Sequence, residues 1–107
     1  MAKKIDKRIK ESLELYVKEL SKHYRIDTAL LFGSRAVGKS HEDSDIDVAI
    51  VTSDIKNRFD DMIKMGCLTY KIDARIEPHP IHTSEFRKNE TPLIDEIIRT
   101  GIKINFV

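Results

Sequence analysis

The chain has 107 residues, of which 40% are apolar and 35% are charged. This composition excludes an intrinsically disordered chain, and the length predicts a single domain over 1–107. Because 19 Lys and Arg are balanced by 18 Asp and Glu, the net charge is +1, and we expect no constitutive binding to nucleic acid.

Cysteine content and apolar runs bear on location. The single cysteine, Cys67, excludes an intrachain disulfide framework and favours an intracellular protein. The longest apolar runs, 29–32 and 48–51, are much shorter than the roughly 18 to 20 residues of a membrane span. The first residues also lack the pattern of a secretion signal. We therefore expect a cytoplasmic protein that does not enter a membrane.

The first half of the chain predicts one helix and two strands. From Ile5 to Tyr24 apolar residues recur at steps of three and four, which indicates an amphipathic helix. The short apolar run 28–32, which Gly33 ends, is typical of a buried strand, and the alternation over 45–51 predicts a second strand. The apolar face of this second strand comprises Ile46, Val48 and Ile50.

A middle helix and a third strand are predicted next. Residues 53–66 carry apolar side chains at helical spacing and end at a glycine. Residues 70–77 alternate between apolar and charged, and we expect Pro78 and Pro80 to stop this strand. The apolar stripe of the predicted helix comprises Ile55, Phe59, Met62 and Ile63.

The C-terminal segment predicts a short helix followed by a short strand. Thr91 is placed as the cap, Pro92 as the first helical residue and Gly101 as the terminator. Residues 102–106 alternate again and predict a fourth strand. Strands interleaved with helices predict an α/β or α+β fold, with one sheet and helices on the apolar face of the second strand.

The loop after the first predicted strand admits two interpretations. Residues 33–40 match the phosphate-binding pattern G-x-x-x-x-G-K-[ST], which requires a helix directly after it. The polar residues 41–44 and the strand that follows leave no room for that helix, so we interpret the match as accidental. The other interpretation joins the start of the loop to the second strand.

In this second interpretation Gly33 and Ser34 form one site with Asp45 and Asp47. Residues two apart on a strand share a face and lie roughly 6.5 to 7 Å apart along the backbone. The two carboxylates can therefore share Mg²⁺ or Mn²⁺, as in centres for phosphoryl transfer. A solvent-facing pair of aspartates is the alternative, but the coupling to a strand that ends in Gly-Ser favours a functional site.

The segments 31–38 (LFGSRAVG) and 44–50 (SDIDVAI) resemble the minimal nucleotidyltransferases of the DNA polymerase beta superfamily. The resemblance is strong over 28–51 and extends to the order of elements elsewhere. It implies a single polymerase-beta-like nucleotidyltransferase domain, with a mixed sheet of about four strands flanked by helices. It also implies Mg²⁺ or Mn²⁺ as cofactor and a nucleoside triphosphate, expected to be ATP, as donor.

The resemblance also assigns roles to residues. It implies metal on Asp45 and Asp47, a close backbone approach at Gly33 and a phosphate contact from Ser34. Arg35 is expected to assist with phosphate charge, as is Lys39, although surface exposure accounts equally well for both.

A third carboxylate is expected on the third strand, as in similar enzymes, where it acts as a metal ligand and catalytic residue. Glu77 and Asp73 are the candidates, and the resemblance favours Glu77 because an extended run and then a helix follow it. For either residue the alternative is an ion pair with Arg75 or Lys71. His79 lies close to Glu77 and is a candidate contact for the nucleotide or acceptor, while a zinc site formed with His82 is disfavoured.

The resulting functional hypothesis is a metal-dependent nucleotidyltransferase. It would transfer a nucleoside monophosphate, expected to be AMP from ATP, to an acceptor hydroxyl with release of pyrophosphate. The chain has no residues left for the additional helical domain of larger relatives, so self-association or a helical partner would complete the acceptor site. The resemblance suggests an HEPN-type toxin as that partner. The alternative is a non-catalytic antitoxin that neutralises its partner by masking it.

Overall fold

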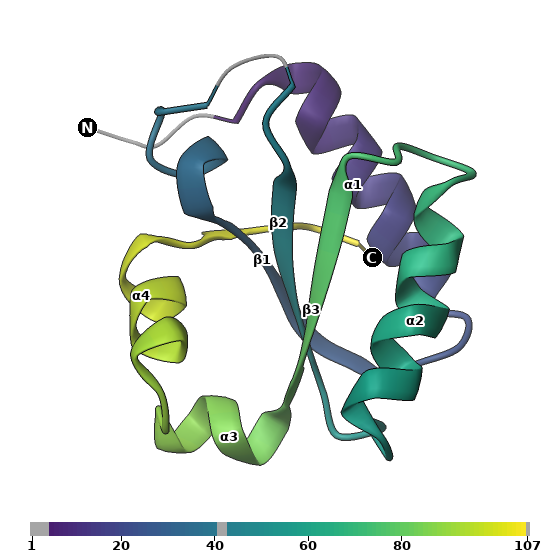
Figure 1. Ribbon diagram of the computed structural model, residues 1–107, viewed down its shortest axis with the longest axis vertical. Coiled ribbons are helices and arrows are strands. Elements are labelled where there is room, and N and C mark those ends of the chain that lie inside the picture. Colours follow the sequence, from purple (N-terminus) through teal and green to yellow (C-terminus); the bar gives the residue numbers. More distant parts are fainter. Residues whose placement is uncertain (1–4, 41–42, 107) are drawn as a thin grey trace.

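Four strands form one mixed sheet in the order β3-β2-β1-β4 (Figure 1). The computed structural model describes residues 5–40 and 43–106. Strand β1 is antiparallel to both β2 and β4, whereas β2 and β3 are parallel. The elements are α1 (Lys7–Leu20), β1 (Ile26–Phe32), the 3-10 turn η1 (Gly33–Arg35), β2 (Ile46–Thr52), α2 (Arg58–Thr69), β3 (Ile76–His82), α3 (Thr83–Lys88), α4 (Pro92–Thr100) and β4 (Ile102–Lys103). The predicted fold class is confirmed.

Helices α1 and α2 cover one face of the sheet, the predicted apolar face of β2 (Figure 1). Tyr16 of α1 is fully buried there, and its hydroxyl donates a hydrogen bond of 2.7 Å to the carbonyl of Met65 in α2. This bond fixes the rotation of α2 against α1. The buried residues of the main core include Ile9, Leu13, Tyr16, Val17 and Leu20 of α1, Ile46, Val48 and Ile50 of β2, and Met65 of α2.

The opposite face of the sheet carries a second, smaller core. Ile94 and Ile97 of α4 pack there on residues of β1 and β2, and Phe86 of α3 packs against them. In Figure 1 these two helices lie below η1, toward the C-terminal ends of β2 and β3. The end of the sheet where β1 stops and β2 and β3 begin lies beside η1, and this end holds the predicted site residues.

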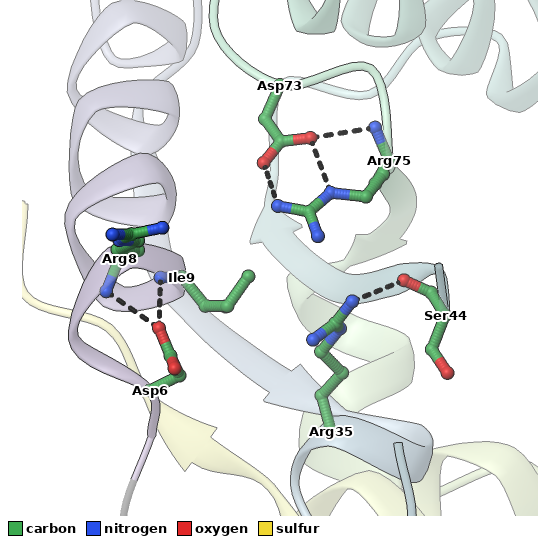
Figure 2. Close-up of polar contacts among 7 residues, drawn as sticks. All are labelled: Asp6, Arg8, Ile9, Arg35, Ser44, Asp73 and Arg75. Atoms are coloured by element: carbon green, nitrogen blue, oxygen red, sulfur yellow. Dashed lines mark hydrogen bonds and ion pairs between the residues drawn. The ribbon is translucent and has the colours of Figure 1, made fainter. Parts of the chain in front are cut away.

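The caps of α4 agree with the sequence prediction. Thr91 is the N-cap and its side chain accepts a hydrogen bond of 3.1 Å from the backbone N–H of Ile94. Pro92 is the first helical residue, and Gly101 is the C-cap. The opening helix α1 is shorter than the predicted 5–24, because the Asp6 carboxylate caps the backbone N–H groups of Arg8 and Ile9 and the helix ends at Leu20 (Figure 2).

The prediction for the middle helix is wrong in its bounds and in its buried face. Helix α2 begins after Asn57, whose side chain accepts from the backbone N–H of Asp60, and it continues through Gly66 to Thr69. Its buried residues are Met65 and Thr69. The predicted core stripe is largely exposed, with exposed fractions of 64% for Phe59, 42% for Met62 and 49% for Ile63.

The third strand is also displaced from its predicted place. Residues 70–75 form turns, and β3 runs from Ile76 to His82 with Pro78 and Pro80 inside it. Because β3 is the edge strand of the sheet that the described residues form, with β2 as its neighbour, two prolines in alternate positions can turn their nitrogens to the open edge and remove no bond from the ladder. The last strand is shorter than predicted, since β4 ends at Lys103 instead of 106.

In the described part of the chain, no helix has the length and apolar character needed to cross a membrane.

Candidate active site

The turn after β1 is shaped by Gly33. Its φ is +76°, a left-handed conformation that favours glycine. A Cβ at this position would also lie 2.6 Å from Oδ2 of Asp47, so a larger residue here would require the Asp47 side chain to move. The Asp47 carboxylate thus lies against this turn, and the close approach of donor phosphates expected at Gly33 stays a prediction. Among the described residues between β1 and β2, the short turn η1 is the helical element. This agrees with the rejection of the phosphate-binding pattern over residues 33–40, which requires a helix directly after it.

Asp47 and Glu77 are neighbours on adjacent strands. Asp47 is the second residue of β2 and is in register with Phe32 of β1 on one side and with Glu77 of β3 on the other. Residues in register on adjacent strands project from the same face of the sheet. The third carboxylate favoured from the sequence therefore lies beside the second aspartate of the motif.

His79 joins these two carboxylates. Its Nε2 lies 3.1 Å from Oδ1 of Asp47 and 4.0 Å from Oε1 of Glu77, and each of the three residues has a ligand atom within 4.8 Å of the others. The imidazole also packs edge-on to the Phe32 ring, with 5.0 Å between the ring centroids. Asp45 is exposed, directly precedes β2 and is not a member of this group.

This group is accessible from solvent. The exposed side-chain fractions are 25% for Asp47, 29% for His79 and 54% for Glu77. Two partly exposed carboxylates suit a hard divalent cation, since Mg²⁺ and Mn²⁺ prefer oxygen ligands and retain bound waters. The donor chemistry therefore fits the expected metal, and the assignment of Asp45, Asp47 and Glu77 as its ligands stays a prediction.

Asp73 is engaged elsewhere (Figure 2). Its carboxylate accepts hydrogen bonds from Nε and Nη2 of Arg75, at 3.0 and 2.8 Å, and a third from the Arg75 backbone N–H. The side-chain hydrogen bonds from Arg75 are the main reason that the pKa of Asp73 lies below its ordinary value. This is the ion pair that the sequence offered as the alternative role, and Asp73 lies before β3 instead of on it.

Ser34 and Arg35 have structural contacts within the loop. The carbonyl of Ser34 accepts from the backbone N–H of Lys39 at 2.9 Å. Nη2 of Arg35 donates to the carbonyl of Ser44 at 2.7 Å, which links the start of the loop to its end (Figure 2). The phosphate contacts expected from Ser34 and Arg35 stay predictions.

His82 has a different role from His79. Its Nδ1 accepts from the backbone N–H of Ser84 at 3.1 Å, and it caps α3 at the end of β3. The contact between His79 and Asp47 was missed by sequence reasoning because β3 was expected to stop at Pro78. The signal was the spacing, since residues two apart on a strand share a face.

Comparison with known proteins gives the family. The chain matches the family described as "Polymerase beta, Nucleotidyltransferase" over residues 14–105. The chain belongs to this nucleotidyltransferase family. A comparison with curated proteins found no significant match.

Solved structures share the fold. One is a candidate nucleotidyltransferase from Sulfolobus solfataricus, with a TM-score of 0.64 and 23% identity over 90% of this chain and 78% of that chain. A second is a toxin–antitoxin structure with AMP-PNP, with a TM-score of 0.64 and 21% identity over 88% of this chain and 73% of that chain. A third is a mutant of the toxin–antitoxin pair MntA–HpeT, with a TM-score of 0.63, 18% identity and the same coverage. At these identities the likeness concerns the fold.

Proposed function

We propose that this nucleotidyltransferase transfers a nucleoside monophosphate, AMP from ATP, to an acceptor hydroxyl and releases pyrophosphate. The observation that carries the proposal is the register of Asp47 with Glu77 beside the Gly33 turn, in a chain of this family. Since nucleoside triphosphates are cytoplasmic metabolites and the chain has one cysteine, the proposed location is the cytoplasm.

The proposed roles follow from position. The turn of Gly33 and Ser34 receives the phosphates of the donor, while Asp45, Asp47 and Glu77 hold Mg²⁺ or Mn²⁺. The bound cation would supply neutralisation of the charge that develops on the transferring phosphate. The fit of the site to that cation rests on the paired carboxylates of Asp47 and Glu77, whose ligand oxygens lie within 4.8 Å of each other.

The reaction balances as a single displacement. The acceptor oxygen forms a bond to the α-phosphorus, the bond from that phosphorus to the bridging oxygen breaks, and pyrophosphate leaves with the electron pair. The acceptor proton passes to solvent or to Glu77, whose side chain is 54% exposed and can return it to water. Positioning accounts for most of the rate in transfers of this kind.

Isothermal titration with Mg²⁺ and a non-hydrolysable triphosphate tests the proposal. The wild type should bind the triphosphate in the presence of Mg²⁺, and Asp47→Asn should lose this binding. Asp73→Asn is the matched control, because Asp73 is bonded to Arg75 and is not in the carboxylate–histidine group. Absence of triphosphate binding by the wild type would overturn the proposal.

We propose further that a helical partner protein of HEPN type completes the acceptor site. Two of the structural neighbours are toxin–antitoxin proteins, which supports a partner of this kind. The exposed apolar residues of α2 support it as well, because Met62 and Ile63 line a cavity of about 390 Å³ that also reaches Glu77. A partner seated on α2 would thus stand next to the proposed catalytic carboxylate.

Mass spectrometry of a co-expressed toxin partner tests this part of the proposal. We expect a mass increase of one AMP on the partner, and none when Asp47→Asn replaces the wild type. A purified chain that modifies only itself would instead indicate self-association as the way in which the acceptor site is completed.

The second candidate function is a non-catalytic antitoxin that masks its partner. The exposed apolar residues of α2 favour it equally, since docking on them requires no chemistry. The double variant Asp45→Asn with Asp47→Asn separates the two functions. Loss of partner neutralisation with an intact complex would support the enzyme, and unchanged neutralisation would support the masking protein.

A further inference from the structure

The proposed metal site contains a donor that an all-oxygen site lacks. Asp47 and Glu77 offer carboxylate oxygens, and His79 offers the Nε2 of its imidazole within 4.8 Å of both. Mg²⁺ favours oxygen ligands and is seldom bound by imidazole, whereas Mn²⁺ and the other divalent first-row transition ions accept carboxylate and imidazole together. The composition of the group therefore bears on which metal binds.

The separations suit ligands of one ion. Two adjacent ligands of an octahedral ion with bonds of about 2.1 Å are about 3 Å apart, and two opposite ligands are about 4.2 Å apart. The distance from Nε2 of His79 to Oδ1 of Asp47 is 3.1 Å, and that to Oε1 of Glu77 is 4.0 Å. Both distances lie within the range that shared coordination requires.

The imidazole is also held in place. His79 lies on β3 in register with Ala49 of β2, so a paired strand positions its backbone. Phe32 packs against the ring at an interplanar angle of 67°, and the side chain is 29% exposed. A ligand whose ring is oriented by packing loses little side-chain entropy on binding a metal.

We propose that Nε2 of His79 is a direct metal ligand together with Asp47 and Glu77, and that the site binds Mn²⁺ more tightly than Mg²⁺ because of it. This inference rests on the proposed function, since it names the metal class of that same site. Coordination requires the lone pair on Nε2, so the ring proton resides on Nδ1 when the ion is bound. The expected preference is at least about tenfold in dissociation constant.

Electron paramagnetic resonance with Mn²⁺ alone provides the decisive test. Titration of the free-ion signal gives the affinity for Mn²⁺, and competition with Mg²⁺ gives the ratio of the two. Electron spin-echo modulation of the bound ion should show coupling to ¹⁴N, which changes to the ¹⁵N pattern when the wild-type protein contains ¹⁵N-histidine. This labelling result needs no substitution and does not depend on a variant that folds.

Two variants assign the nitrogen to its residue. His79→Gln keeps a polar group beside Asp47 but removes the imidazole, and we expect it to lose the nitrogen coupling and to bind Mn²⁺ about 10 to 100 times more weakly. Its affinity for Mg²⁺ should change less than about threefold. His23→Gln is the matched control, because His23 is exposed just after α1, and this variant should keep both the coupling and the Mn²⁺ preference.

The outcomes separate this inference from the proposed function. Triphosphate binding and transfer with Mn²⁺ bound but no nitrogen coupling would overturn the inference alone and leave His79 as a hydrogen-bond partner that positions Asp47. An equal Mn²⁺-to-Mg²⁺ ratio in the wild type and His79→Gln would overturn it as well. Nitrogen coupling in a protein that binds no triphosphate would support the inference and overturn the proposed function.

Discussion

Gly33 and Asp47 are the two residues that constrain each other most closely in the site. The glycine has a positive φ, and any Cβ there would collide with Oδ2 of the aspartate. The backbone therefore favours glycine here, and a larger residue would in addition force the Asp47 carboxylate to move. Gly38 has the same φ of +76°, yet a Cβ there would meet nothing within 4 Å.

This difference between two glycines makes a sharp prediction. Both Gly33→Ala and Gly38→Ala should lower the free energy of unfolding by about 1–2 kcal/mol, since both place alanine in the left-handed region. Gly33→Ala alone should displace Asp47 and lose Mn²⁺ binding by calorimetry. Equal metal binding by the two variants would contradict the proposed place of Asp47 in the metal site.

A second prediction at the residue scale concerns the third carboxylate. Glu77→Gln removes a charge beside Asp47 with little change of shape and should lower the transfer rate about 10² to 10⁴-fold, the range that loss of a general base causes. Triphosphate binding should weaken much less. Asp73→Asn should leave turnover within a few-fold in the same assay, and the reverse order of the two effects would reassign the role to Asp73.

At the scale of elements, the outcome of sequence prediction depended on whether the signal was local. The caps of α4 were predictable because Thr91, Pro92 and Gly101 act within one helix. The bounds of β3 were not, because prolines stop a central strand but are tolerated on an edge strand, and edge position is a property of the whole sheet. The core face of α2 was missed for a similar reason, since packing against α1 selects Met65 over the apolar stripe seen in the sequence.

The same distinction applies to the candidate site. Gly33, Asp45 and Asp47 lie within one short motif, so local spacing identified them. The choice of Glu77 depended on an assumption about which strand pairs with β2. The observed register of Glu77 with Asp47 is consistent with that assumption. The contact from His79 required the true course of β3, because its spacing of two from Glu77 indicates a shared face only if the strand continues past Pro78.

The turn that leads into β3 carries a pH-dependent prediction. The hydrogen bonds from Arg75 hold the pKa of Asp73 below its ordinary value, so the folded state prefers the ionised carboxylate. The resulting stability is complete above the unfolded carboxyl pKa of about 3.9 and is lost as the pH falls through the lower folded value. Since the pair is partly exposed, Asp73→Asn should reduce the free energy of unfolding at pH 7 by about 1 kcal/mol.

Urea unfolding of the wild type and Asp73→Asn at a series of pH values measures this contribution. The difference between the two proteins should be constant from pH 7 to about pH 5 and should shrink below about pH 4. Asp43→Asn is a suitable control because Asp43 is exposed in the loop before β2, and its effect should stay within about 0.5 kcal/mol at neutral pH. A difference for Asp73→Asn that grew on acidification would contradict the ion pair.

At the scale of the whole molecule, the proposed site lies on the sheet face opposite α2, but Met62 of α2 lines one cavity with Glu77 and another with His79 at the edge of the sheet. The sheet brings Asp47, Glu77 and His79 to one end, and α2 runs beside the edge strand that carries two of them. Because Pro78 and Pro80 have no backbone N–H, that edge lacks hydrogen-bond donors at two positions, which disfavours the addition of a further strand. A partner would therefore dock through side chains, and α2 offers exposed apolar residues of that kind, of which Met62 lines a cavity with His79.

The last prediction tests this surface as the place where the proposed helical partner docks. Phe59→Glu with Ile63→Glu should weaken the complex at least about tenfold, or about 1.4 kcal/mol, because two exposed apolar side chains that the partner would bury become charged. Glutamate is a good helix former, so the thermal stability of the isolated chain should change little. Leu15→Glu is the matched control, since Leu15 is 60% exposed on α1, and it should leave the affinity unchanged in calorimetry. If Leu15→Glu weakened the complex and the α2 variant did not, the partner would dock on α1, away from Glu77, and transfer to a hydroxyl of that partner would lose its structural basis.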